Sequence, residues 1–200
     1  MKIVLVRHGY SVGNKMGTYT GWSDVELTEE GIEDLKRYKE EYDYPQTDLY
    51  YSSDLKRAVD TFDILFGDKQ VLKEKSPELR EIYFGNLEDK KGSEVKINFA
   101  DLWSLNERHE NWETITEFSY RIISKVEQIL RDMKKDGKES ATIVCHSGVI
   151  KTLLIFLGHR PHLDFKEIPT ENGLGYILDL DYDEDSGKML LNHYEEIKKK

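Results

Sequence analysis

The sequence is poor in cysteine and in positive charge, and it has no long apolar run. A single cysteine, Cys145, leaves no internal disulfide and no cysteine-built metal site. No stretch approaches the roughly 20 apolar residues of a membrane helix, and the apolar run 3–6 is too short for a signal peptide. Basic residues number 29 against 39 acidic ones, a formal net charge of −10. Because nucleic-acid and anionic-membrane binders usually carry the opposite sign, we expect neither partner and predict a soluble, cytoplasmic protein.

What the chain contains is sufficient for one folded domain. Its 200 residues include 3 Trp, 12 Tyr and 7 Phe, a content that argues against disorder. The length fits a single domain spanning residues 1–200. If the substrate is an anion, the positive field that attracts it must be local, because the protein as a whole repels it.

Segments with strand character alternate with segments of helical spacing. The predicted strands are 3–6, 48–52, 71–75, 141–145, 174–180 and 189–194, the last two as an antiparallel hairpin. The predicted helices begin after Thr28, after Ser53 or Asp54, at the capping box that Thr114 opens, and near Val149. The alternation predicts an α/β fold of three layers, with a mostly parallel sheet flanked by helices. We expect a loop over 11–20 and an irregular lid over about 82–112.

Two predicted strands end at a histidine, and a third leads into a helix that begins with an arginine. His8 and His146 follow the first and fourth predicted strands, and Arg57 lies in the first turn after the second. Ligands of open α/β sheets bind beyond the carboxyl ends of the strands, so we expect Arg7, His8, Arg57 and His146 to converge. Two guanidinium groups and two imidazoles would form a cationic pocket suited to a phosphoryl group.

An imidazole in such a pocket can act as a nucleophile toward phosphorus. The attacking nitrogen must be neutral, and the other ring N–H needs an acceptor, for which a backbone carbonyl near Gly9 is the candidate. The leaving oxygen needs a proton, and Glu81 is the candidate acid.

Five short blocks carry these residues in a fixed order. They are LVRHGYSVGN at 5–14, YTGWSD at 19–24, SSDLKRA at 52–58, LREI at 79–82 together with Phe84-Gly85 and Glu88, and VCHSGVI at 144–150. Together they resemble the histidine phosphatase superfamily, which is also called phosphoglycerate mutase-like. The resemblance extends from residue 3 to about residue 155.

The resemblance implies a role for each member of the constellation. His8 would be phosphorylated and then dephosphorylated by water or a second acceptor. Arg7, Arg57 and His146 would hold the phosphoryl oxygens, and Glu81 would protonate the leaving group and later activate water. The resemblance implies no metal and no cofactor. It also assigns phosphate or pocket contacts to four further residues: Asn14, Thr20, Gly21 and Ser147.

Departures from the mutases point to the broad phosphatase branch of the family. Phe84 stands where the mutases carry a tyrosine, Ser147-Gly148 replaces their Gly-Asn, and no Arg-Arg pair occurs in the chain. The predicted function is a metal-independent phosphatase that hydrolyses small phosphorylated metabolites. A bisphosphoglycerate-dependent phosphoglycerate mutase and a non-catalytic phospho-ligand sensor are the alternatives. The sequence leaves open the substrate, the oligomeric state and which lid residues touch the substrate: Tyr83, Phe84, Lys90, Lys91, Trp103 or Arg108.

Overall fold

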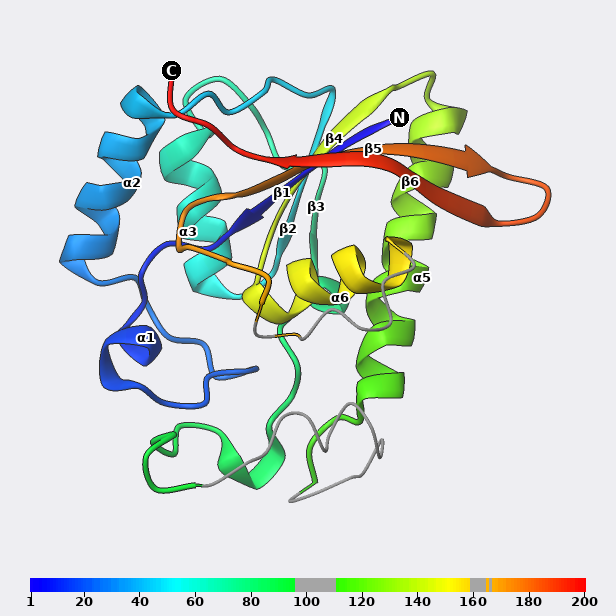
Figure 1. Ribbon diagram of the computed structural model, residues 1–200. Coiled ribbons are helices and arrows are strands. Elements are labelled where there is room, and N and C mark those ends of the chain that lie inside the picture. Colours follow the sequence, from blue (N-terminus) through cyan, green and yellow to red (C-terminus); the bar gives the residue numbers. More distant parts are fainter. Residues whose placement is uncertain (96–110, 159–164, 166) are drawn as a thin grey trace.

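The computed structural model describes residues 1–95, 111–158, 165 and 167–200. In this part of the chain six strands form one sheet in the order β3-β2-β4-β1-β5-β6 (Figure 1). The strands are β1 (Lys2–Arg7), β2 (Leu49–Ser53), β3 (Glu74–Ser76), β4 (Ser140–Cys145), β5 (Gly175–Asp183) and β6 (Lys188–Glu196). The pairs β3–β2, β2–β4 and β4–β1 are parallel, whereas β1–β5 and β5–β6 are antiparallel. The predicted α/β fold with a mostly parallel sheet is confirmed, and so is the C-terminal hairpin.

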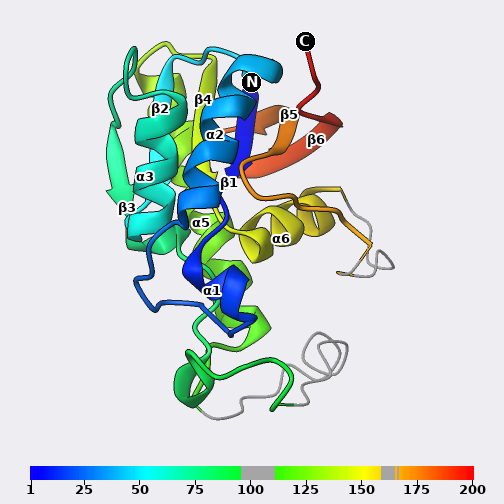
Figure 2. The ribbon, with the colours of Figure 1, turned by 90° about the vertical axis from the view of Figure 1, so that its left-hand side faces the viewer.

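Helices cover both faces of the sheet. The helices in the described residues are α1 (Val12–Met16), α2 (Glu29–Glu41), α3 (Lys56–Leu65), α5 (Ile115–Lys135) and α6 (Ser147–Leu157), with short 3-10 helices η1 (Pro77–Leu79) and η2 (Gly85–Leu87). Side chains of a strand alternate between its faces. Accordingly Ile3 and Leu5 belong to the apolar cluster that α5 and α6 line, and Val4 and Val6 to the cluster lined by α2 and α3. Figures 1 and 2 show α2 and α3 on one side of the sheet and α5 on the other, which gives three layers.

Helix α5 begins where the sequence predicts. The backbone N–H of Glu117 donates to Thr114 Oγ1 at 3.2 Å, and that of Thr114 donates to Glu117 Oε2 at 2.9 Å. This reciprocal capping box satisfies two donors that the first turn would otherwise leave unpaired. It fixes the start of the helix that carries Arg121, a residue used below.

Two local expectations are wrong. Residues 12–16 form helix α1 and not a loop, because the side chains of Ser11 and Asn14 complete a capping box of their own. Neither Ser53 nor Asp54 caps α3; its N-cap is Leu55, which gives no side-chain hydrogen bond. The exposed N–H of Lys56 instead donates to Asp24 Oδ1 at 2.6 Å, an acceptor 32 residues earlier in the chain that no local pattern could indicate.

The expected lid is only partly within the described residues. Residues 80–84 have no regular secondary structure, and η2 follows them. Phe84 and Trp112 are buried and lie 6.5 Å apart between ring centroids, so these two aromatic residues pack in the core. Trp103 and Arg108 lie outside the described residues. Among the helices that are described, none is long and apolar enough to cross a membrane.

Candidate active site

The carboxyl end of β1 presents His8 with one ring nitrogen already engaged. His8 Nδ1 lies 2.7 Å from the carbonyl oxygen of Gly9, so this nitrogen carries the proton and donates it. The tautomer that results leaves a lone pair on Nε2. Burial lowers the pKa of His8 well below its usual value, and the charges of Arg57 and Arg7 lower it further. The imidazole is therefore neutral near pH 7, as a nucleophile requires.

His146 lies beside His8 at the end of the neighbouring strand β4. The two ring centroids are 5.2 Å apart, and His146 is the N-cap of α6. Its Nε2 lies 2.9 Å from Ser53 Oγ at the end of β2, so three adjacent strand ends meet here. Burial and the charge of Arg57 lower the pKa of His146 well below its usual value.

Two largely buried guanidinium groups lie close to these rings. Arg57 donates to the carbonyl oxygens of Ser23 and Gly21, each at 2.8 Å, and Arg7 donates to that of Thr170 at 2.5 Å. Burial lowers the pKa of Arg57 to about 10, although nearby Glu81 opposes the shift. Both groups are cationic at pH 7, because a guanidinium group in a protein keeps its proton.

These four side chains have nitrogen atoms whose hydrogen-bonding capacity the described residues do not use. The buried atoms Arg7 Nε, Arg57 Nε and His146 Nδ1 have no partner in the part of the chain that the structure describes. Buried polar atoms are paired in the large majority of cases. Two positive charges with unused nitrogen atoms suit an anion rich in acceptors, and a phosphoryl group is such an anion.

Glu81 completes the group from a segment that is not part of the sheet. Its Oε2 accepts from the backbone N–H of Gly148 at 2.9 Å, and its Oε1 from that of Ile82 at 3.1 Å. Its negative charge raises the pKa of both Arg7 and Arg57 against the larger effect of burial, so the carboxylate lies near both guanidinium groups. The structure thus brings together all five residues for which the sequence predicts a catalytic role.

The four predicted contact residues lie around this group in different ways. Gly21 lies directly beside Arg57, to which its carbonyl is bonded, and the Ser147 hydroxyl lies 2.6 Å from Thr170 Oγ1. Thr20 Oγ1 is bonded to Thr18 Oγ1 at 3.0 Å, within its own loop.

Asn14 Oδ1 is occupied by three donors. They are Ser11 N at 3.1 Å, Ser11 Oγ at 3.0 Å and Asn172 Nδ2 at 3.1 Å. These contacts assign the oxygen of the amide, so its NH2 group is directed away from them. An amide NH2 is a donor, as a phosphate ligand must be.

Sequence reasoning missed two residues that organise the site. Glu88 accepts from the backbone N–H groups of Gly21, Trp22 and Ser23 at 3.0–3.1 Å, and so holds the loop whose carbonyls bind Arg57. Asn172 donates to the carbonyl oxygens of His8 and Gly9 and to Asn14. Glu88 stood within a recognised block, but Asn172 follows no motif and lies about 160 residues from its partners.

The described residues contain no cluster of three or more His, Cys, Asp or Glu side chains that could hold a metal ion. Cys145 is buried, and burial raises the pKa of its thiol far above the usual value. It is a small apolar side chain in β4, and it is not a nucleophile.

Curated proteins of known name are similar to this chain. A curated 2,3-bisphosphoglycerate-dependent phosphoglycerate mutase from Borrelia garinii subsp. bavariensis is 27% identical over 91% of this chain and 88% of its own length. A protein of the same name from Treponema denticola is 36% identical, but the match covers 50% of this chain and 43% of that protein. The chain therefore spans less than half of the Treponema protein.

Solved structures share the fold. TTHB049 from Thermus thermophilus is 28% identical and superposes with a TM-score of 0.69, covering 90% of this chain and 94% of that one. YhfR from Bacillus stearothermophilus, 24% identical, superposes with a TM-score of 0.80 over 96% and 95% of the two chains, and shows the likeness of fold alone. The profile of the histidine phosphatase superfamily (branch 1) matches residues 3–192, and the chain belongs to that family.

Proposed function

We propose that the protein is a metal-independent phosphatase that hydrolyses small phosphorylated metabolites through a phosphohistidine on His8. The observation that carries the proposal is the hydrogen bond from His8 Nδ1 to the Gly9 carbonyl, 2.7 Å long. It fixes the tautomer with the lone pair on Nε2, in a ring whose pKa burial keeps low. A site that only bound a phosphorylated ligand would not need a neutral imidazole between two cationic guanidinium groups.

In the first step His8 Nε2 attacks phosphorus, an N–P bond forms, and the bond from phosphorus to the ester oxygen breaks. Arg7 and Arg57 stabilise the negative charge that spreads over the phosphoryl oxygens. Glu81, in its protonated form, gives its proton to the leaving alkoxide. The positive charge that develops on the imidazole is stabilised through Nδ1–H by the Gly9 carbonyl.

In the second step water attacks the phosphohistidine. The Glu81 carboxylate accepts a proton from this water, the N–P bond breaks, and phosphate leaves. His8 regains its lone pair and Glu81 its proton, so the cycle closes without a change in either residue.

The second candidate is the mutase reaction, which the names of the curated relatives support better than hydrolysis. It would use the same phosphohistidine, with a second oxygen of the substrate as acceptor in place of water. The residues of this chain favour water. Phe84, where the mutases have a tyrosine, is buried against Tyr19 and Trp112 and presents no hydroxyl to a substrate.

The first test is hydrolysis of p-nitrophenyl phosphate in the presence of EDTA by the wild type and by His8→Ala. We expect turnover by the wild type and none by the variant. If the wild type does not release phosphate but isomerises 3-phosphoglycerate after priming with the bisphosphate, the mutase replaces the phosphatase. If it does neither, and no phosphohistidine forms, catalysis is ruled out in favour of phospho-ligand binding.

A further inference from the structure

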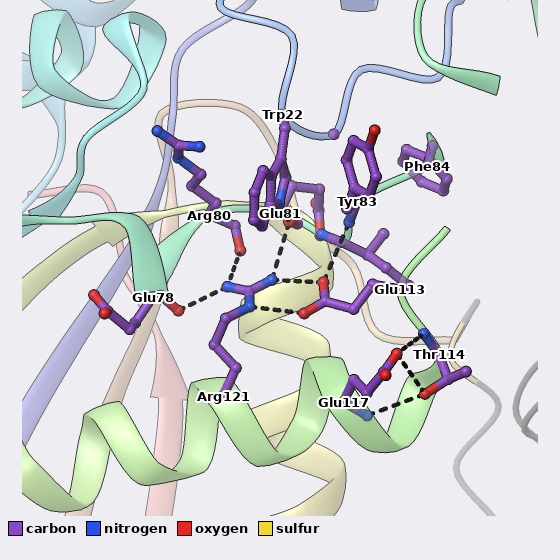
Figure 3. Close-up of polar contacts among 12 residues, drawn as sticks. Trp22, Glu78, Arg80, Glu81, Tyr83, Phe84, Glu113, Thr114, Glu117 and Arg121 are labelled. Atoms are coloured by element: carbon purple, nitrogen blue, oxygen red, sulfur yellow. Dashed lines mark hydrogen bonds and ion pairs between the residues drawn. The ribbon is translucent and has the colours of Figure 1, made fainter. Parts of the chain in front are cut away.

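Arg121 on α5 holds the backbone on the N-terminal side of Glu81 (Figure 3). Its Nη1 donates to the carbonyl oxygens of Glu78 at 2.8 Å and Arg80 at 3.0 Å, and its Nη2 donates to that of Glu81 at 3.2 Å. Nε and Nη2 also donate to the two carboxylate oxygens of Glu113 at 2.8 and 2.7 Å. Because an arginine has five N–H donors, these contacts use all of them.

Glu113 holds the same segment on the other side of Glu81. Its Oε2 accepts from the backbone N–H of Tyr83 at 3.3 Å, and its own N–H donates to the Tyr83 carbonyl at 2.9 Å. Trp22 adds a second donor to the Glu81 carbonyl, through Nε1 at 3.0 Å. The backbone is therefore fixed at residue 81 through the arginine and at residue 83 through the carboxylate.

The pair is largely shielded from water, with side-chain exposures of 15% for Arg121 and 12% for Glu113. A two-pronged guanidinium–carboxylate contact is directional, so it defines an orientation as well as a distance. Burying two charges costs free energy, and such a pair is weak evidence for a gain in stability. The role that these contacts support is to fix the geometry of the segment around Glu81.

Glu81 needs this support because no strand holds it. It lies between η1 and η2, in residues 80–84 that have no regular secondary structure. His8 and His146, by contrast, directly follow strands of the sheet. A catalytic group displaced by about 1 Å can lose about 100-fold in rate, so an acid on irregular backbone depends on whatever fixes that backbone.

We propose that Arg121, oriented by Glu113, is a positioning residue that sets where the Glu81 carboxyl stands relative to the leaving oxygen. The inference rests on the proposed function, in which Glu81 protonates that oxygen. It predicts that damage to the pair weakens protonation of the leaving group and spares phosphate binding and attack by His8.

The test compares Arg121→Lys with the wild type on two substrates. p-Nitrophenolate leaves readily without a proton, whereas the alkoxide of glycerol phosphate does not. In single-turnover measurements we expect formation of the phosphohistidine from glycerol phosphate to slow by about 10- to 100-fold, with the half-saturating substrate concentration unchanged, and formation from p-nitrophenyl phosphate to slow by less than about 3-fold. Hydrolysis of the phosphohistidine, in which Glu81 activates water, is common to both substrates and slows alike with both. Arg131→Lys is the matched control, since Arg131 lies on the same helix and pairs with Glu127, but is exposed.

Equal losses in the rate of phosphohistidine formation from both substrates would show that Arg121 only supports the fold, and would overturn the inference while the proposed function stands. A wild type that turns over neither substrate and forms no phosphohistidine would overturn the proposed function, and the inference with it. If Arg121→Lys does not fold, Glu113→Gln makes the same comparison, because the amide keeps the shape and loses the charge that orients the guanidinium. If neither variant folds, the pair is structural and the inference fails.

Discussion

The backbone N–H of Gly148 donates to Oε2 of Glu81 at 2.9 Å, and the space between the two residues is too small for a methyl group. A Cβ at position 148 would lie 2.0 Å from Glu81 Oε1 and 3.0 Å from Cδ. The glycine that follows Ser147 thus lets the proposed acid reach the site.

Gly148→Ala should displace the Glu81 carboxyl and impair protonation of the leaving group. In a single turnover we expect formation of the phosphohistidine from an alkyl phosphate to slow by about 100-fold or more, in the range that general acid catalysis supplies, with a smaller effect on its formation from p-nitrophenyl phosphate. Gly92→Ala is the control, because its Cβ would come no closer than 3.6 Å to another heavy atom. Unchanged turnover of the alkyl phosphate by Gly148→Ala would contradict the role given to Glu81.

Asn172→Asp should slow formation of the phosphohistidine. The substitution keeps the shape of the side chain and replaces an NH2 donor by an oxygen, which then faces the carbonyl of His8 at 2.9 Å and Asn14 Oδ1 at 3.1 Å. Loss of these contacts frees the Asn14 amide and loosens the Gly9 carbonyl that orients His8. A buried acceptor left without its donor costs about 1–3 kcal/mol, which corresponds to a loss of about 5- to 150-fold in single-turnover phosphorylation.

The exposed residue Asn192 provides the control for this change, as Asn192→Asp adds the same charge far from any strand end that carries the site. Rapid-quench measurement of phosphohistidine with p-nitrophenyl phosphate gives the rate. Equal rates for the wild type and Asn172→Asp would show that Asn172 does not position His8 or Asn14 for phosphoryl transfer.

The sheet and the residues at its strand ends could be predicted because their signals are local. Apolar runs mark β1 and β4, and the residue after each of them is His8 or His146. The alternation of strands with helices then implies that the carboxyl ends meet at one edge. Capping boxes that use Thr and Glu are equally local, and the start of α5 was predicted from one.

The supporting contacts could not be predicted because they join residues that are distant in sequence. Asn172 reaches His8 across 164 positions, and Asp24 provides the missing cap of α3 across 32. Nothing in the local pattern around Arg121 distinguishes it from a solvated charge on an amphipathic helix. Such contacts depend on how the elements pack, which periodicity does not determine.

Glu88→Gln should weaken substrate binding more than it slows the chemical step. The carboxylate accepts from five donors, which belong to Gly21, Trp22, Ser23 (backbone and hydroxyl) and Phe84. An amide can match these N–H groups with one oxygen only, so the loop that holds Arg57 loses its anchor. Hydrogen bonds to charged groups contribute about 1.5–3 kcal/mol each, so we expect a lower melting temperature and a KM raised by about 10-fold. Glu29→Gln, which removes one exposed carboxylate in α2, should change neither quantity.

Protonation of the buried histidines should destabilise the protein in mild acid. The pKa of His8 is lowered by burial and by Arg57 and Arg7, and that of His146 by burial and Arg57, whereas both would titrate near about 6.5 in the unfolded chain. Between these values the unfolded state binds more protons than the folded state, so the free energy of unfolding falls as the pH falls below about 6.5. Each histidine contributes up to about 1.4 kcal/mol per pH unit.

Urea unfolding of the wild type and His8→Gln between about pH 5 and pH 7 isolates the contribution of His8, since other acidic groups titrate alike in both proteins. We expect the free energy of unfolding of the wild type to fall more steeply toward acid, by up to about 1.4 kcal/mol per pH unit, because the glutamine takes up no proton in either state. Parallel curves would mean that His8 binds its proton equally well in the folded and unfolded chain. The imidazole would then be half charged near pH 6.5, and the neutral nucleophile on which the proposed phosphoryl transfer depends would no longer follow from the buried position of His8 between Arg7 and Arg57.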